Sequence, residues 1–130
     1  MKMSPAGIAG IILVIVLVGI VILFALPNSP DSDVPNGTYD SFAQCITQAG
    51  AKMYGAFWCP HCNDQKASFG SGWQYVTYIE CSTPDGTDQL PVCAAAGISG
   101  YPTWVFADGS RIEGIASFPQ LAAKTSCTLP

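Results

Sequence analysis

The hydrophobic pattern divides the chain into one long apolar run and a patterned remainder. Residues 8–26 (IAGIILVIVLVGIVILFAL) contain 19 consecutive apolar residues and no charge. As a helix this run measures about 28 Å, close to the roughly 30 Å of a bilayer's hydrocarbon core. It predicts a single membrane-spanning helix that is retained as an anchor. The alternative is a cleaved signal peptide, whose apolar core is normally about 7–15 residues long and precedes a small-x-small site. Here Leu23-Phe24-Ala25 places a bulky residue in that site.

The residues flanking the run predict its orientation. Lys2 precedes it, Asp31 and Asp33 follow it, and the next basic residue is Lys52. The positive-inside tendency then places residues 1–7 in the cytoplasm and the rest of the chain outside. All six cysteines lie beyond residue 44, which fits an oxidising compartment. Residues 27–37, rich in proline and polar residues, are typical of a flexible linker.

Residues 38–130 alternate between helical spacing and short β-rich runs. The predicted elements are helix 40–49, buried strand 52–57, helix 60–70, strand 75–80, helix 90–96, a hairpin of 103–107 and 111–114 around Asp108-Gly109, and helix 117–126. This succession predicts an α/β domain with a mixed sheet flanked by helices.

The candidate chemistry is the pair Cys59 and Cys62, between a buried strand and a helix opened by Pro60. A cysteine at a helix N-cap is stabilised as a thiolate by unpaired N–H groups and the helix dipole. Cys59 is therefore the predicted nucleophile, and Cys62, one turn further on, the resolving thiol. His61 would add positive charge or a donor beside the thiolate; alternatively it is a solvated residue at the helix start.

Other site classes fit the composition poorly. Structural zinc wants four ligands, whereas the chain offers one Cys-x-x-Cys pair and a single histidine beside it. Nine acidic residues outnumber five basic ones, which argues against a nucleic-acid partner. We expect neither a metal nor an organic cofactor.

The motifs resemble a known fold. Trp58-Cys59-Pro60-His61-Cys62 after a buried strand, followed by Gly100-Tyr101-Pro102-Thr103, a hairpin and a final helix, resembles the thioredoxin fold over residues 38–130. The family's first strand has no counterpart, so the resemblance implies a trimmed version. The stretches YGAFWCPHCNDQK, YIECSTPDG and AGISGYPTW are similar to the thioredoxin-like domain attached to bacterial homologues of vitamin K epoxide reductase. The Pro-His pair between the cysteines resembles that of the periplasmic dithiol oxidases.

The resemblance implies roles for further residues. Pro102 would be a cis-proline facing the dithiol, Tyr101 would contribute substrate specificity, and Trp58 would cover Cys59. The alternatives are a plain strand-entry proline and half-buried packing. Thioredoxins also carry a buried acid six residues before the first cysteine. Met53 occupies that position here, which disfavours a fast reductase.

Cys45, Cys81, Cys93 and Cys127 admit three pairings. The resemblance to the vitamin K domains implies a Cys81–Cys93 bridge, and parity then leaves Cys45–Cys127. The thioredoxin fold, however, usually packs its first and last helices on opposite faces of the sheet. Two buried or unpaired thiols, or a second redox relay, are the alternatives for Cys45 and Cys127.

Together these features predict a membrane-anchored, extracytoplasmic thiol–disulfide oxidoreductase. It would oxidise reduced client proteins and be recharged by a quinone-linked membrane oxidase of the vitamin K epoxide reductase type. The competing hypotheses are a reductase or isomerase of the same fold and a non-catalytic binding module in which Cys59 and Cys62 form a permanent bridge.

Overall fold

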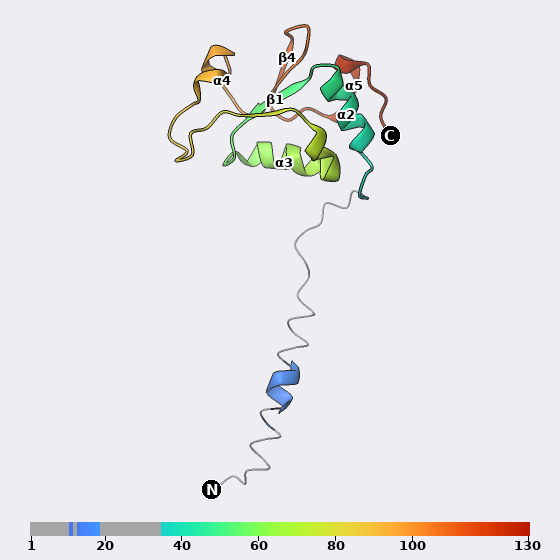
Figure 1. Cartoon of the computed structure of the whole chain (residues 1–130), viewed down its shortest axis with the longest axis vertical. Coiled ribbons are helices and arrows are strands. Elements are labelled where there is room, and N and C mark those ends of the chain that lie inside the picture. The colour runs from blue at the N-terminus through green and yellow to red at the C-terminus, as the bar shows by residue number, and fades with distance from the viewer. Residues whose placement is uncertain (1–10, 12, 19–34) are drawn as a thin grey trace. The chain divides into compact units, whose positions relative to one another are not determined.

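The computed structural model describes residue 11, residues 13–18 and residues 35–130 (Figure 1). Residues 11 and 13–18 are helical. The segment 1–7, the remainder of the predicted anchor over 8–26 and most of the linker over 27–37 lie outside the described residues. Among the described residues, no helix combines the length and the apolar character needed to cross a membrane. The anchor therefore stays a prediction.

Helices and strands follow one another over residues 40–125. In chain order they are α2 (Asp40–Gln48), β1 (Lys52–Gly55), α3 (Pro60–Phe69), the 3-10 helix η1 (Gly70–Tyr75), β2 (Tyr78–Glu80), α4 (Pro91–Ala95), β3 (Thr103–Val105), β4 (Arg111–Glu113) and α5 (Phe118–Thr125). The predicted order of helices and strands is confirmed, and η1 is an addition to it. The glycine-rich sequence of η1 has no periodicity from which a helix could be predicted.

The four strands form one mixed sheet in the order β2-β1-β3-β4. β1 runs parallel to β2 and antiparallel to β3, and β3 pairs antiparallel with β4. No strand precedes α2 within residues 35–130. This mixed sheet with its helices fits a thioredoxin-like fold that lacks the usual first strand.

Side chains on the two faces of the sheet build two separate cores. Met53 on β1 and Trp104 on β3 are fully buried in the larger core. Tyr54, the next residue on β1, belongs to the smaller core with Cys81 and Cys93. Because successive side chains of a strand point to opposite faces, the two cores lie on opposite sides of the sheet.

The larger core is shared by α2, α3 and α5. The ring of Phe118 lies 5.6 Å from that of Phe42 on α2 and 4.8 Å from that of Phe69 at the end of α3, centroid to centroid. α5 is fixed at its start by a capping box, in which Ser117 and Gln120 satisfy each other's backbone N–H groups. α2 and α5 therefore pack together, which corrects the expectation that they cover opposite faces.

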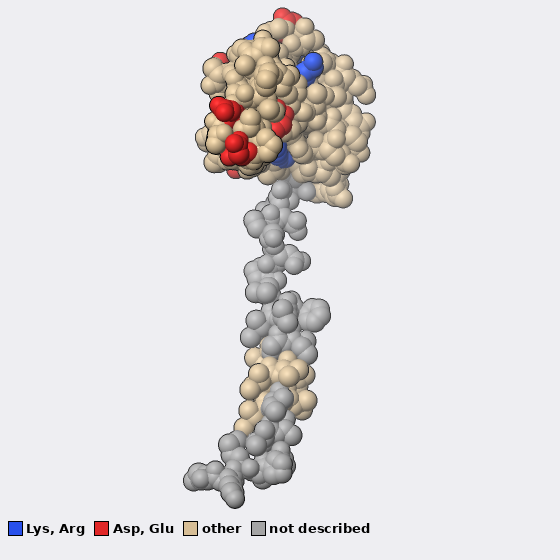
Figure 2. All heavy atoms as spheres, turned by 60° about the vertical axis from the view of Figure 1, so that its left-hand side comes forward, with Lys and Arg blue, Asp and Glu red and all other residues tan. Residues whose placement is uncertain are grey.

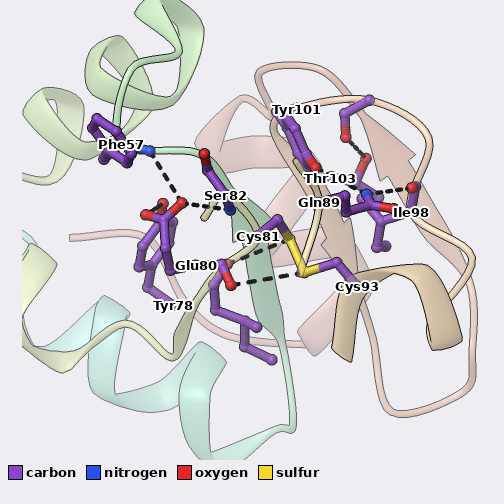
Figure 3. The surroundings of a disulfide bond; sticks show 12 residues. Phe57, Tyr78, Glu80, Cys81, Ser82, Gln89, Cys93, Ile98, Tyr101 and Thr103 are labelled. Atoms are coloured by element: carbon purple, nitrogen blue, oxygen red, sulfur yellow. Dashed lines mark hydrogen bonds between the residues drawn. A yellow bond between two sulfur atoms is a disulfide. The ribbon is translucent and has the colours of Figure 1, made fainter. Parts of the chain in front are cut away.

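Two disulfides close the fold. Cys45 on α2 is bonded to Cys127 just beyond α5, with 6.0 Å between their Cα atoms. Cys81, directly after β2, is bonded to Cys93 on α4, with 5.5 Å between Cα atoms (Figure 3). The contact between α2 and α5 is what brings Cys45 within reach of Cys127.

Candidate active site

Cys59 and Cys62 lie where β1 leads into α3, and these two cysteines are free thiols. Cys59 is the N-cap of α3, in an extended conformation, and Pro60 is the first helical residue. Proline suits that position because its missing N–H would have no partner in the first turn. Only 6% of Cys59 is exposed, and its thiol lies 3.6 Å from the Tyr101 carbonyl oxygen, to which it donates. The structure thus places the predicted nucleophile at a helix N-terminus, largely buried beneath the Tyr101 segment.

Cys62 lies one turn further into the protein and is fully buried. Burial raises the pKa of the Cys62 thiol to about 12, and the neighbouring Cys59 adds to this shift. A backbone hydrogen bond from Ala56 and the charge of Lys66 act in the opposite direction. The two thiols therefore occupy unequal environments, and Cys62 is a neutral thiol at physiological pH.

Gly55, the last residue of β1, makes room for this thiol. A Cβ atom at Gly55 would stand 2.8 Å from Cys62 Sγ and 2.9 Å from a ring carbon of Tyr78. Both distances are shorter than real Cβ contacts. A glycine is thus required at the point where the strand meets the active-site helix.

The segment around Pro102 faces the dithiol. The Tyr101–Pro102 peptide bond is cis, as the resemblance implies. Pro102 is buried, whereas Tyr101 is half-buried, and the Tyr101 hydroxyl accepts a hydrogen bond from Gln89 at 2.8 Å. The Tyr101 backbone carbonyl accepts from the Cys59 thiol, so this segment lies next to the predicted nucleophile.

Trp58 stands at the surface between Tyr101 and the loop over residues 82–89. Its indole N–H donates to Ser82 Oγ at 2.9 Å, and its ring lies edge-on to that of Tyr101, with centroids 6.1 Å apart. Phe57 and Trp58 are 48% and 51% exposed. The exposed aromatic rings beside Cys59 form an apolar rim on which a polypeptide could pack.

The His61 side chain points into solvent and pairs with an acid on its own helix. Its side chain is 70% exposed and its Nδ1 lies 4.0 Å from Asp64 Oδ2, one turn along α3. No hydrogen bond between His61 and Cys59 occurs among the described residues. Any effect of His61 on Cys59 would therefore be electrostatic, and solvent at the exposed helix start would screen it.

Gln65 connects α3 to the rest of the domain. Its side chain is 1% exposed, and its Oε1 accepts from the Trp104 indole N–H at 3.2 Å and from the Ala116 backbone N–H at 2.7 Å. Trp104 belongs to β3, and Ala116 lies just before α5. A single buried amide oxygen thus holds the active-site helix against two other elements.

Tyr78 and Glu80 are two further residues near the dithiol, and the sequence patterns did not single them out. Tyr78 donates its phenolic hydrogen to Glu80 Oε2 at 2.7 Å. Glu80 Oε1 accepts from the backbone N–H groups of Ser82 at 2.9 Å and Phe57 at 3.2 Å (Figure 3). Their place follows from the parallel β1–β2 register, which pairs Gly55 with Glu80 and which no sequence pattern indicated. That register places the acid at the end of β1, beside the start of α3.

Negative charge borders one side of the site. Asp85 and Asp88 are exposed in the loop that contacts Trp58, and Figure 2 shows acidic side chains gathered on the face that it turns forward. Hydrogen bonds from Thr83 and Thr87 lower the pKa of Asp85, which keeps this carboxylate ionised. The described residues contain no group of three or more His, Cys, Asp or Glu side chains placed to hold a metal ion.

Comparison with known proteins finds similarity to a plant oxidoreductase. No protein-family model matches the chain. The chain is 42% identical over 94 residues to a protein of Arabidopsis thaliana named thiol-disulfide oxidoreductase LTO1. The match covers 68% of this chain and 24% of the plant protein, so the chain spans about a quarter of that relative's length.

Proposed function

We propose that residues 38–130 form a thiol–disulfide oxidoreductase that acts through Cys59 and Cys62. The observation that carries this proposal is the unequal dithiol, with Cys59 at the N-cap of α3 and slightly exposed, and Cys62 fully buried one turn behind it. The other four cysteines are bonded in pairs and cannot serve as the nucleophile. The similarity to a plant thiol–disulfide oxidoreductase supports the same activity.

The exchange can be written for the oxidised form of the pair. A client thiolate attacks Cys59 Sγ, the Cys59–Cys62 bond breaks, and Cys62 leaves with the electron pair and takes up a proton. A second client thiolate then attacks the client sulfur of the mixed disulfide and releases Cys59 as a thiolate. The client loses two electrons, and the Cys59–Cys62 pair gains them.

We further propose a direction of disulfide exchange and a cellular location for the domain. The domain oxidises reduced client proteins outside the cytoplasm and is held to the cell membrane by residues 8–26. A membrane oxidase of the vitamin K epoxide reductase type recharges it. Tethering would raise the effective concentration of the domain near such a partner. Met53, fully buried where thioredoxins carry an acid, supports the oxidising direction over fast reduction.

Replacement of Cys62 by serine is expected to trap mixed disulfides. Without the resolving thiol, a client or glutathione bound to Cys59 cannot be displaced from within the protein. Non-reducing gels and intact mass of the full-length chain after mixing with a disulfide peptide would show the adduct. Cys59→Ser is the matched control and should give none. If the domain is instead a non-catalytic binding module, neither variant should give an adduct. This result would refute the catalytic proposal.

The reduction potential decides the direction of exchange. The full-length chain would be equilibrated in glutathione buffers of graded potential, and the Cys59–Cys62 pair read by thiol labelling and mass. We expect a value between about −100 and −180 mV, as for oxidants and isomerases. A value near about −270 mV would instead assign the chain to the reductases.

A further inference from the structure

Met53 has no group that could exchange a proton with Cys62, whereas the phenol of Tyr78 and the carboxyl of Glu80 can each carry one. We propose that the hydrogen-bonded Tyr78–Glu80 pair is the proton relay of Cys62, taking its proton when it attacks and returning one when it leaves. This inference rests on the proposed exchange activity of Cys59 and Cys62, and it adds two residues of β2 to the reacting site.

The position of Tyr78 is the first support. The point where a Gly55 Cβ would stand lies 2.8 Å from Cys62 Sγ and 3.3 Å from the Tyr78 hydroxyl oxygen. The buried sulfur and the phenol oxygen therefore both border the small space that a side chain at Gly55 would fill, and glycine leaves that space open. The same face of β2 carries Tyr78 and Glu80, since they are two residues apart on a strand.

The fixed geometry of Glu80 is the second support. One carboxylate oxygen accepts from the backbone N–H groups of Ser82 and Phe57, and the other accepts from the Tyr78 hydroxyl. Phe57 lies two residues before Cys59, so the acid is bonded directly to the loop that carries the nucleophile. Glu80 is only half-buried, which allows it to exchange protons with solvent.

A relay is needed because, among the described residues, the other ionisable groups beside Cys62 are its reaction partner Cys59 and the cation Lys66. The thiol is fully buried, and Met53, also fully buried, occupies the position where a thioredoxin carries a carboxylate. The charged or ionisable groups that face the Tyr78–Cys62 region are Cys59, Glu80 and Lys66. The Lys66 ammonium lies 3.9 Å from the centroid of the Tyr78 ring, from the side of α3. A cation there favours any negative charge that develops on the phenol or the sulfur.

The proton movements balance in both directions. When Cys62 attacks a mixed disulfide on Cys59, its S–H proton passes to the Tyr78 oxygen while the Tyr78 proton passes to the Glu80 carboxylate. The Cys59–Cys62 bond forms, and the departing thiolate carries away the electron pair. When a client thiolate opens the disulfide, the protonated Glu80 returns a proton through Tyr78 to the Cys62 thiolate.

Reaction of the reduced full-length chain with the aromatic disulfide dithiobis-nitrobenzoate separates the two thiols. Attack by Cys59 releases a first coloured thiolate, and attack by Cys62 on the resulting mixed disulfide releases a second. We expect Tyr78→Phe to slow the second release about tenfold and leave the first unchanged, because a positioned proton acceptor typically contributes at least that much. Tyr75→Phe, at an exposed tyrosine, is the matched control and should change neither phase.

The pH profile distinguishes a relay from simple packing. Without the relay the second release depends on the small thiolate fraction of Cys62, whose raised pKa makes the rate climb about tenfold per pH unit. The native chain should show a much flatter profile. Glu80→Gln keeps an oxygen for the Ser82 and Phe57 N–H groups and should show the steep profile of Tyr78→Phe.

Two results would overturn the relay. One is an unchanged second release in both variants, and the other is a slowed release whose pH profile stays parallel to that of the native chain. Loss of the first release in the native chain would refute the proposed function itself, since Cys59 would then not be a nucleophile.

Discussion

Replacement of both Cys45 and Cys127 by alanine is expected to lower the free energy of unfolding by about 4 to 5 kcal/mol. The bond joins residues 82 positions apart, and the entropy that a cross-link removes from the unfolded chain increases with loop length. For a domain of this size that loss is a large part of the total stability. Urea unfolding of the full-length chain, followed by tryptophan fluorescence, would measure it.

The pair Cys81 and Cys93 is the matched control for this prediction. It closes a loop of 12 positions, so its replacement by alanine should cost about 3 kcal/mol. An equal or larger loss for the shorter loop would contradict the chain-entropy argument. It would indicate that packing around the bridge in the smaller core dominates instead.

Gln65→Leu is expected to cost about 2 to 4 kcal/mol of stability. Leucine approximates the volume of glutamine but leaves the Trp104 indole N–H and the Ala116 N–H without an acceptor in the interior. Each buried donor left unpaired costs about 1–3 kcal/mol. Because Gln65 lies on α3, we also expect slower exchange at Cys59. Thermal unfolding and the rate of glutathione adduct formation would check the two effects.

Gln44→Leu on α2 is the control for Gln65→Leu. Gln44 is exposed and makes no side-chain hydrogen bond within the described residues, so its replacement should change stability by less than about 0.5 kcal/mol. Equal losses from the two substitutions would show that the amide oxygen of Gln65 contributes nothing specific.

The order of elements was predictable because each carries a local signal. Pro60 and Gly70 bracket α3, and the Asp108-Gly109 turn marks the hairpin of β3 and β4. The placement of Cys59 at a helix start follows from the same signals. These capping and turn signals act over a few residues, so they could be interpreted without knowledge of the tertiary contacts.

The contacts between distant segments were not predictable in the same way. The location of Glu80 beside the dithiol depends on the register that pairs it with Gly55. Three successive residues of β1 are buried, so the strand shows no alternation from which that register could be predicted. The packing of α5 on α2 depends on how Phe118 fits between Phe42 and Phe69. Both features arise from side-chain shape in three dimensions.

The division into two cores has a consequence for the chemistry of the sulfur atoms. Cys59 and Cys62 belong to the core on one face of the sheet, and Cys81 and Cys93 to the core on the other. A thiolate must approach a disulfide in line with the sulfur–sulfur bond, and the strands between the faces block that approach. Thiol–disulfide exchange between Cys59 or Cys62 and the Cys81–Cys93 bond of the same chain is thereby prevented. Cys59 and Cys62 can therefore be oxidised and reduced repeatedly while the Cys81–Cys93 disulfide on the other face of the sheet stays intact.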